Sequence, residues 1–391
     1  MCGTRCARAS RASVARARLD ERLSRSSTST TARMRRRVTS TQSSFDDDST
    51  RTNAFDAVPM KTLETALRVV ERARFASTRD ATWSESSSGA AVCAPKRRAW
   101  AFVHFVGGAA LGAVPRVAYE EVLERCCATC GVVVVATPYE LGNDHDAIAV
   151  GVRERFQKAK REVCEREQFD ERAMPVFRVG HSLGCKLLVV GACDGAEEDD
   201  VVDVDAASGS VRVRGREDGN TVGYFLMAFN NASASDTVML VEKFARALLK
   251  TRAGENAAAF DFLKNLPSIA AFAERAAKAA GFEFKPSPEE TLARVRARYS
   301  ARKTRLLSFR DDELDQNVEL AEALKARFAV YPGTVDTREI EGNHLTPVYF
   351  TIDASKLSPG LERVLSNFSL GDDAGVGRLA DALNAWILGK D

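Results

Sequence analysis

Short apolar segments alternate with longer amphipathic ones along most of the chain. Runs of four to eight apolar residues between turn residues are typical of buried strands, and apolar positions three or four residues apart are typical of helices. The pattern predicts strands at Ala91–Ala94, Trp100–Val106, Val132–Ala136, Pro175–Gly180, Val222–Phe229, Thr304–Phe309 and Val335–Ile340. It predicts helices at residues 115–130, 146–167, 182–192 and 377–388. Such alternation indicates an α/β fold, a mostly parallel sheet with helices on both faces.

Two segments interrupt this alternation. Residues 194–220 are polar and mostly acidic, which predicts a solvated surface loop. Residues 237–300 have a largely helical pattern in which six Phe lie among Ala, Arg and Lys. We expect this insertion to form a helical cap over the active site, and we assign residues 56–391 to a single domain that includes both insertions. A short leading helix is also predicted within residues 59–75.

The first 55 residues differ in composition from the rest. Residues 1–54 contain 12 Arg, no Lys and 5 acidic residues, a net charge of +7, which leaves about −5 for the remainder of a chain of net charge +2. An Arg- and Ser/Thr-rich, acid-poor segment without an apolar core is typical of an organelle transit peptide, and the alternative is a basic tail that binds an acidic partner. The mildly acidic body argues against a nucleic-acid-binding surface.

Apolar runs and cysteines exclude other classes of protein. The longest apolar stretch, Ala99–Pro115, contains three Gly and one His and is shorter than the roughly 20 residues that a bilayer requires. The nine Cys are scattered and odd in number, which favours reduced thiols. Cys127 and Cys130 form a CxxC motif, but no second CxxC or paired His lies nearby, so we interpret these thiols as helix packing and expect no metal and no cofactor.

The strongest chemical signal is the motif Gly180-His181-Ser182-Leu183-Gly184. It follows the apolar strand PVFRV and precedes the apolar helix CKLLVVGA, and a G-x-S-x-G motif in that context is the nucleophile elbow of α/β hydrolases. The sharp turn exposes the hydroxyl of Ser182. The backbone N–H of Leu183, at the helix N-terminus, is then directed at the oxyanion that develops during acyl transfer.

Only four histidines are available as the base. His344 is the only one of the four that follows Ser182 in the sequence, and in this fold the triad residues occur in the order Ser, acid, His. The acid is expected after the strand that ends at Phe309, and we favour Asp312, with Asp311 as the close rival. Asp315 is interpreted as the N-cap of the next helix. Asp236 is a weaker alternative for the acid, one strand earlier.

The second oxyanion donor is expected in the glycine-rich loop after the strand at 100–106. We assign it to the N–H of Gly108, with Ala109 nearly as good, while a plain tight turn is the structural alternative. His145, after the fourth-strand loop, is a candidate substrate-binding residue. So is Asn230, in the loop FNNASAS.

Several longer segments of the sequence resemble a known protein family. HFVGGAALGAVPRVAYEEVLE, VVVVATPYELGNDHDAIA, FRVGHSLGCKLL, FLMAFNNASAS, SFRDDELDQN and EGNHLTPVY together resemble the plant, algal and cyanobacterial family of α/β hydrolases catalogued as domain of unknown function 1350. The resemblance runs from about Trp83 to the C-terminus. The family is distributed among photosynthetic lineages, which implies that the transit peptide directs the protein to the chloroplast, with the mitochondrion as the alternative. The resemblance implies no particular substrate.

These observations predict a serine hydrolase that cleaves a small-molecule ester or thioester through an acyl-enzyme. The Phe-bearing insertion suggests an apolar, lipid-derived acyl group. The alternative is a non-catalytic binding or assembly protein of the same fold, because a fold alone never establishes an activity. A lyase or acyltransferase that uses the same triad is a third hypothesis. No nucleic-acid partner and no transmembrane segment are expected.

Overall fold

The computed structural model describes residues 81–109, 111–194, 201–205, 210–214, 220–233, 236, 283–351 and 369–390. The predicted transit peptide, the predicted helix within residues 59–75 and residues 237–282 of the predicted cap lie outside these residues. The acidic segment at 194–220 is described in part. Its backbone includes an antiparallel pair of strands, β6 (Val201–Asp205) and β7 (Ser210–Arg214), that no prediction placed there.

Eight strands form the main sheet of the described residues, in the order β1-β2-β4-β3-β5-β8-β9-β10. They are β1 (Ala81–Glu85), β2 (Ala91–Pro95), β3 (Phe102–Val106), β4 (Val133–Ala136), β5 (Val176–His181), β8 (Thr221–Met227), β9 (Lys303–Phe309) and β10 (Thr334–Ile340). From β4 to β10 neighbouring strands are parallel, whereas β1 and β2 join the edge in antiparallel fashion. All seven predicted strands are present, and β1 is an addition.

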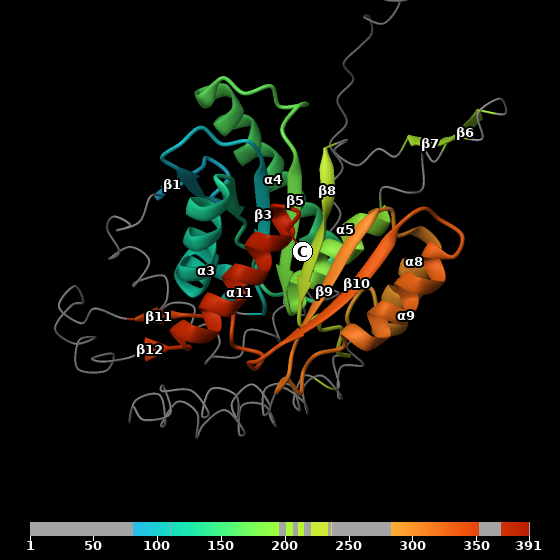
Figure 1. Cartoon of the computed structure of the whole chain (residues 1–391). Helices are drawn as coiled ribbons and strands as arrows, with labels where there is room; N and C mark the ends of the chain where they lie inside the picture. Colours follow the sequence, from blue (N-terminus) through green and yellow to red (C-terminus); the bar gives the residue numbers. More distant parts are fainter. Residues whose placement is uncertain are drawn as a thin grey trace, which may run out of the picture. The chain divides into compact units, whose positions relative to one another are not determined.

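Helices cover both faces of this sheet (Figure 1). They are α3 (Pro115–Cys130), α4 (His145–Glu167), α5 (Leu183–Asp194), α8 (Pro288–Arg298), α9 (Asn317–Phe328) and α11 (Asp373–Ile387), with a short 3-10 turn, η2 (Leu111–Ala113), before α3. Helices α3 and α11 share one apolar cluster with the sheet, and α4, α5, α8 and α9 pack on the opposite face. A two-stranded sheet, β11 (Phe350–Thr351) with β12 (Ser369–Leu370), lies outside the main one.

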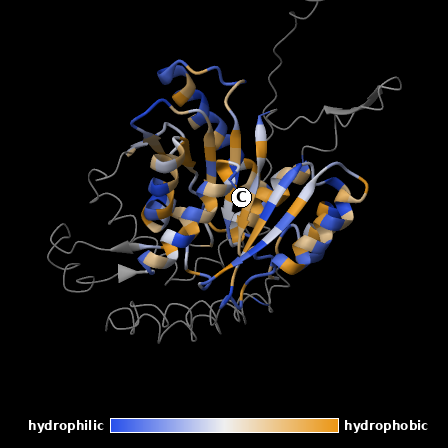
Figure 2. Cartoon of the chain, viewed as in Figure 1, coloured by the Kyte–Doolittle hydropathy of each residue, from blue (hydrophilic) through white to orange (hydrophobic). Residues whose placement is uncertain are grey.

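Side chains of the central strands alternate between the two helix layers, as the pleat requires. In β3, Val103 and Phe105 join the cluster under α3, whereas Phe102 packs toward α4. All five residues of β3 are buried, so its sequence reads as a continuous apolar run. Figure 2 shows the same contrast between these apolar central strands and the mixed edge strand β10, most of whose residues are exposed.

The end of the predicted cap belongs to the helix layer. Helix α8 packs against α5 and α9 and buries Val295 in their apolar cluster. It begins with a capping box, in which the Ser287 hydroxyl accepts from the N–H of Glu290 and the Glu290 carboxylate accepts from the N–H of Ser287. Residues 288–298 therefore cover the sheet, and only residues up to 287 remain to form a cap.

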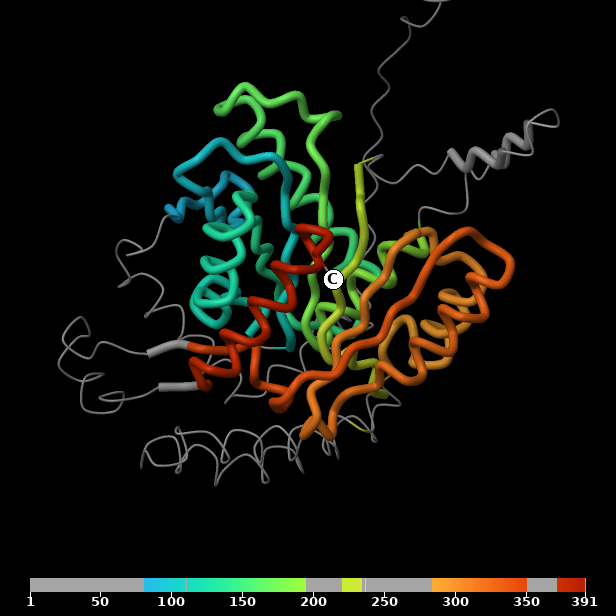
Figure 3. Tube along the Cα trace, viewed as in Figure 1, coloured from blue at the N-terminus to red at the C-terminus, as the bar shows by residue number. Residues whose placement is uncertain are grey.

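The path of the chain through the parallel strands can be followed in Figure 3. Strands β3, β5, β8, β9 and β10 run in the same direction, so the loops that follow them lie at one edge of the sheet. That edge carries the segments after Val106, His181, Phe309 and Ile340, which hold the predicted site residues. The sheet order, the helix layers and the strand-to-helix turn at Ser182 are those of the α/β-hydrolase fold, as predicted.

Candidate active site

Ser182 occupies a strained turn between β5 and α5. Its φ is +54°, in the left-handed region that residues with a side chain rarely adopt. The turn is held because the Ser182 N–H donates to the carbonyl oxygen of Met227 at 2.9 Å and the Ser182 carbonyl accepts from the N–H of Cys185 at 3.0 Å. Such strain is a known feature of nucleophile elbows, because it directs the hydroxyl out of the sheet.

Gly184 makes this turn possible. A Cβ at Gly184 would lie 2.2 Å from the carbonyl oxygen of Val106 and 2.5 Å from that of Gly107. The first turn of α5 thus presses directly on the backbone at the end of β3, and any side chain would push the two apart. The second glycine of the motif is therefore required by packing between the elbow and the loop after β3.

The three predicted triad residues lie together. The His344 Nε2 atom is 2.9 Å from Ser182 Oγ, and His344 Nδ1 is 2.8 Å from Asp312 Oδ2. All three are shielded from water: Ser182 is 8% exposed as a residue, and the side chains of His344 and Asp312 are 6% and 0% exposed. An imidazole whose Nδ1–H donates to a carboxylate presents an unprotonated Nε2 to the serine hydroxyl. In this arrangement Nε2 can accept the proton of the Ser182 hydroxyl.

The loop after β9 selects Asp312 over Asp311. The second oxygen of Asp312 accepts from the N–H of Leu314 at 2.8 Å, which fixes the carboxylate with one oxygen left for His344. Asp311 is exposed, and its backbone N–H donates to the carbonyl of Gly342 at 2.9 Å, which joins this loop to the one that carries His344. Asp236, the weaker alternative, is exposed and accepts from the Ser233 hydroxyl instead.

Asp315 lies beside the predicted triad. Burial raises its pKa to about 6, against the effects of hydrogen bonds from Ser308 and from the backbone of Asn317. Its carboxylate accepts from the N–H of Asn317 at 2.8 Å, the first residue of α9. The interpretation of Asp315 as the N-cap is wrong by one residue, because Gln316 holds the N-cap position and Asp315 precedes it.

The two predicted oxyanion donors differ in whether their backbone N–H already has a hydrogen-bond partner. Leu183 is the first residue of α5, where a backbone N–H has no acceptor within the helix. The N–H of Gly108, by contrast, already donates to Tyr119 Oη at 2.9 Å, so it is not free for an oxyanion. Gly108 does lie against the nucleophile, because a Cβ there would be 3.1 Å from Ser182 Cβ. The loop after β3 therefore lies beside Ser182, and a role for it in oxyanion binding stays a prediction.

Ala109, the alternative to Gly108, has a backbone N–H that is available as a donor. The carbonyl oxygen of Gly108 accepts from the N–H of Gly112 at 2.6 Å, which fixes the peptide that joins Gly108 to Ala109. In a trans peptide the N–H points away from the C=O, so the Ala109 N–H is directed away from Gly112. Ala109 is exposed, and its N–H has no hydrogen-bond partner among the described residues.

The two predicted substrate-binding residues have structural partners. His145 is 2% exposed, and its ring stacks on Phe284 with centroids 4.6 Å apart. Burial, with the nearby charge of Lys186, lowers the pKa of His145 to about 3, so the ring is neutral. Asn230 donates from Nδ2 to the carbonyl of Leu314 at 3.0 Å and so supports the Asp312 loop. For both residues, contact with a substrate stays a prediction.

Sequence reasoning missed two tyrosines that hold the loop after β3. Tyr119 of α3 accepts the Gly108 N–H, and Tyr139 donates from Oη to the carbonyl oxygen of Gly107 at 2.9 Å. Both are buried. His181, which directly precedes Ser182, lies 2.8 Å from Tyr119 Oη through Nδ1. The only available signal was the polar character of these side chains within otherwise apolar surroundings.

The thiols of α3 are packed as predicted. Cys127 donates to the carbonyl of Cys93 at 3.5 Å, and Cys130 donates to Asn384 Oδ1 at 3.2 Å. No cluster of three or more His, Cys, Asp or Glu side chains in the described part of the chain is arranged to hold a metal ion. Among those same residues, no helix is long and apolar enough to cross a membrane.

Comparison with known proteins gives a family and several distant structural likenesses. Residues 82–199 and 213–358 match the family model described as "Protein of unknown function (DUF1350)". No curated protein matches the chain. Similar solved structures include the Francisella virulence factor BioJ (11% identity, 87% of this chain and 93% of that one, TM-score 0.47). Others are a thermostable esterase from Pseudomonas putida (14%, 84% and 89%, TM-score 0.42) and a hyperthermophilic esterase from Pyrobaculum calidifontis (16%, 85% and 93%, TM-score 0.44).

Proposed function

The chain belongs to the family described as "Protein of unknown function (DUF1350)", and from the geometry of its site we propose that it is a serine hydrolase that cleaves a carboxylic ester or thioester. One observation carries this proposal: Ser182, His344 and Asp312 form a continuous, buried chain of hydrogen bonds of 2.9 and 2.8 Å. A buried serine, imidazole and carboxylate in this order is the arrangement that activates a hydroxyl for attack on an acyl carbon.

In the first half of the proposed reaction, Ser182 Oγ attacks the acyl carbon while its proton passes to His344 Nε2. Asp312 holds the imidazole through Nδ1 and stabilises the imidazolium that forms. The N–H groups of Leu183 and Ala109 donate to the tetrahedral oxyanion, which is where a hydrolase of this kind gains most of its rate. His344 then protonates the departing alcohol or thiol, and the acyl group remains on Ser182.

In the second half, water takes the place of the leaving group. His344 Nε2 accepts a proton from this water as it attacks the acyl-enzyme, and the same oxyanion donors serve the second tetrahedral intermediate. Collapse of that intermediate returns the proton to Ser182 Oγ and releases a carboxylic acid. These steps require neither a metal nor a redox group, and the substrate class is a small molecule with an acyl carbon that Ser182 can reach.

Labelling with a fluorophosphonate tests the proposal, because this probe reacts covalently with activated serines. The full chain should label, and Ser182→Ala and His344→Ala should each abolish labelling. Ser300→Ala is a matched control: its hydroxyl donates to the carbonyl of Ala192 at 2.7 Å, at the opposite end of the sheet from the triad, and labelling of this variant should equal that of the wild type.

A folded wild-type chain that does not label would overturn the hydrolase proposal. Labelling that persists in Ser182→Ala would place the reactive serine elsewhere in the chain. In the first case the fold would be serving a binding or assembly role, and partner capture with the intact chain would replace the search for a substrate.

A further inference from the structure

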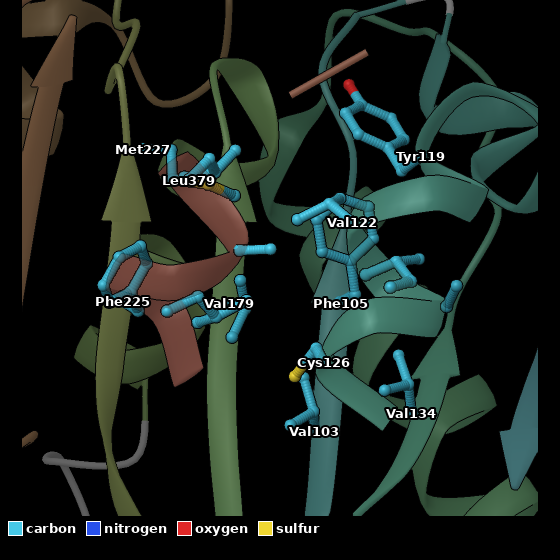
Figure 4. Close-up of a cluster of buried hydrophobic side chains, with 14 of the residues drawn as sticks. Val103, Phe105, Tyr119, Val122, Cys126, Val134, Val179, Phe225, Met227 and Leu379 are labelled. Atoms are coloured by element: carbon cyan, nitrogen blue, oxygen red, sulfur yellow. The ribbon is translucent and has the colours of Figure 1, made fainter. Parts of the chain in front are cut away.

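The hydroxyl of Tyr119 is a polar group among apolar neighbours. Tyr119 lies on α3 and is fully buried, with its ring packed on Phe105 at a centroid distance of 4.7 Å. Figure 4 shows that the hydroxyl points away from the labelled apolar side chains of this cluster. A buried hydroxyl costs free energy unless it is hydrogen-bonded, and Tyr119 Oη has two partners, the N–H of Gly108 and the ring of His181.

The directions of these hydrogen bonds follow from the carbonyl at one end. His181 Nε2 lies 2.9 Å from the backbone oxygen of His344, and an oxygen of that kind only accepts, so Nε2 carries the proton. Burial and the proximity of His344 lower the pKa of His181 well below its usual value, so the ring is neutral and its Nδ1 is unprotonated. Tyr119 Oη therefore donates to Nδ1 and accepts the Gly108 N–H.

This chain of hydrogen bonds joins three segments that are distant in sequence. Gly108 lies in the loop after β3, which faces the nucleophile. His181 directly precedes Ser182 in the elbow, and the carbonyl at the far end is that of the base, His344. The three bonds measure 2.9, 2.8 and 2.9 Å, and the rings of His181 and His344 are 4.9 Å apart.

The peptide between Gly107 and Gly108 is held from both ends. Its N–H donates to Tyr119, and its carbonyl accepts from Tyr139 Oη at 2.9 Å. The two tyrosines thus fix the plane of this peptide, and the next peptide carries the Ala109 N–H. Tyr119 also fits closely against the loop, because a Cβ at Gly107 would lie 2.7 Å from its Cε2 atom. The orientation of the Ala109 donor therefore depends on both hydroxyls.

We propose that Tyr119 and His181 form a positioning bridge, which holds the loop of the second oxyanion donor in register with both the nucleophile and the base. This inference rests on the serine hydrolase function proposed above. Neither side chain touches the reacting atoms; each acts through the backbone groups that it fixes. Loss of the Tyr119 hydroxyl leaves the Gly108 N–H and His181 Nδ1 without partners, and the loop relaxes relative to Ser182.

Substitution of Tyr119 by Phe removes the hydroxyl and keeps the ring. With p-nitrophenyl acetate as the probe, we expect Tyr119→Phe to lower kcat by about 10- to 100-fold, less than full loss of an oxyanion donor. The Michaelis constant should stay within about threefold, because the donor acts mainly on the transition state. Tyr139→Phe, which frees the carbonyl end of the same peptide, should lower kcat in the same direction.

Tyr299→Phe is the matched control. Tyr299 is also fully buried and its Oη pairs with Thr304 Oγ1 at 2.9 Å, but Thr304 lies near the start of β9, at the end of the sheet opposite the triad. This variant should lose stability as Tyr119→Phe does and keep the wild-type kcat. Equal loss of kcat in both variants, or a kcat for Tyr119→Phe within twofold of the wild type, would overturn the bridge as a positioning device.

Nitrogen NMR of the histidine-labelled wild-type chain tests the bridge without a substrate. The resonances of His181, assigned by their loss in His181→Gln, should show the neutral Nε2–H form between pH 5 and 8. A protonated Nδ1 would contradict the bridge. A wild-type chain that neither hydrolyses the probe nor labels, with His181 in the Nε2–H form, would overturn the proposed function and the catalytic role of the bridge while confirming its hydrogen bonds.

Discussion

Asp311 and Asp312 are neighbours in sequence with opposite surroundings. The Asp312 side chain is fully shielded and contacts His344, whereas Asp311 is exposed. Asp312→Asn keeps the shape of the side chain but removes the charge that stabilises an imidazolium, and it favours the wrong tautomer of His344. We expect the rate of fluorophosphonate labelling to fall by roughly 10³- to 10⁴-fold in Asp312→Asn.

Asp311→Asn provides the control for that prediction. It makes the same chemical change one residue away, and its labelling rate should stay within about twofold of the wild type because surface substitutions have small effects. The labelling rates of the two purified variants show which aspartate acts with His344. A larger loss in Asp311→Asn than in Asp312→Asn would mean that the acid of the triad has been assigned to the wrong residue.

At the scale of residues, the sequence predicts the groups that a motif or a process of elimination defines. Ser182 follows from its elbow, and His344 from the scarcity of histidines after it. The sequence leaves Asp311 and Asp312 as rivals because only the folded loop after β9 determines which of the two carboxylates faces His344. The sequence does not show that the Gly108 N–H is already paired, because its acceptor is a hydroxyl on the following helix, and no spacing rule states where that hydroxyl points.

At the scale of elements, helix α5 contains two glycines with different roles. A Cβ at Gly184 would lie 2.2 Å from the carbonyl oxygen of Val106, whereas a Cβ at Gly191 would meet no atom within 4 Å. Because the obstacle at Gly184 is backbone, Gly184→Ala requires α5 and β3 to move apart. We expect it to lower the free energy of unfolding by about 1–3 kcal/mol, as overpacking does, and to slow fluorophosphonate labelling.

Gly191→Ala is the matched substitution on the same helix. Alanine is favoured over glycine within a helix by about 0.5–1 kcal/mol, so this variant should be more stable than the wild type and should label at the same rate. Chemical denaturation of both variants gives the two free energies. If Gly184→Ala is as stable and as reactive as Gly191→Ala, the close approach of the elbow to β3 has no energetic consequence.

The elements themselves were largely predictable, with informative exceptions. All seven predicted strands are central or carry a recognisable run of β-forming residues. Strand β1 was missed because, of its five residues, only Ala81 is buried, so ATWSE lacks an apolar pattern. Helix α8 was predicted as part of a cap, but its apolar residues face α5 and α9. A helical pattern shows which face is buried and does not show what buries it.

At the scale of the whole molecule, the strand order depends on contacts that no local pattern defines. Alternating strands and helices predict a parallel sheet, yet the placement of β4 between β2 and β3 and the antiparallel edge follow only from the completed fold. The order brings the loops after β3, β5, β9 and β10 together at one edge. The proposed triad, the proposed donor loop and Asp315 therefore come together only in the folded chain.

Asp315 links that site to the stability of the whole molecule. Its pKa is about 6 in the folded protein because of burial, compared with 3.8 for the free side chain. A raised pKa means that the folded state binds the proton more tightly than the unfolded chain does. The contribution of Asp315 to stability is therefore fully present below about pH 4 and is lost as the pH rises through about 6.

The Asp315→Asn variant isolates this contribution, because every other titrating group is common to both proteins. Between pH 5 and pH 7.5, the free energy of unfolding of the wild type should decrease relative to that of Asp315→Asn by on the order of 1 kcal/mol. Urea denaturation of both proteins at the two pH values measures the difference. If the wild type gains stability relative to the variant as the pH rises, the carboxylate is stabilised in its charged form. In that case its hydrogen bonds with Asn317 and Ser308, and not its burial, determine its behaviour.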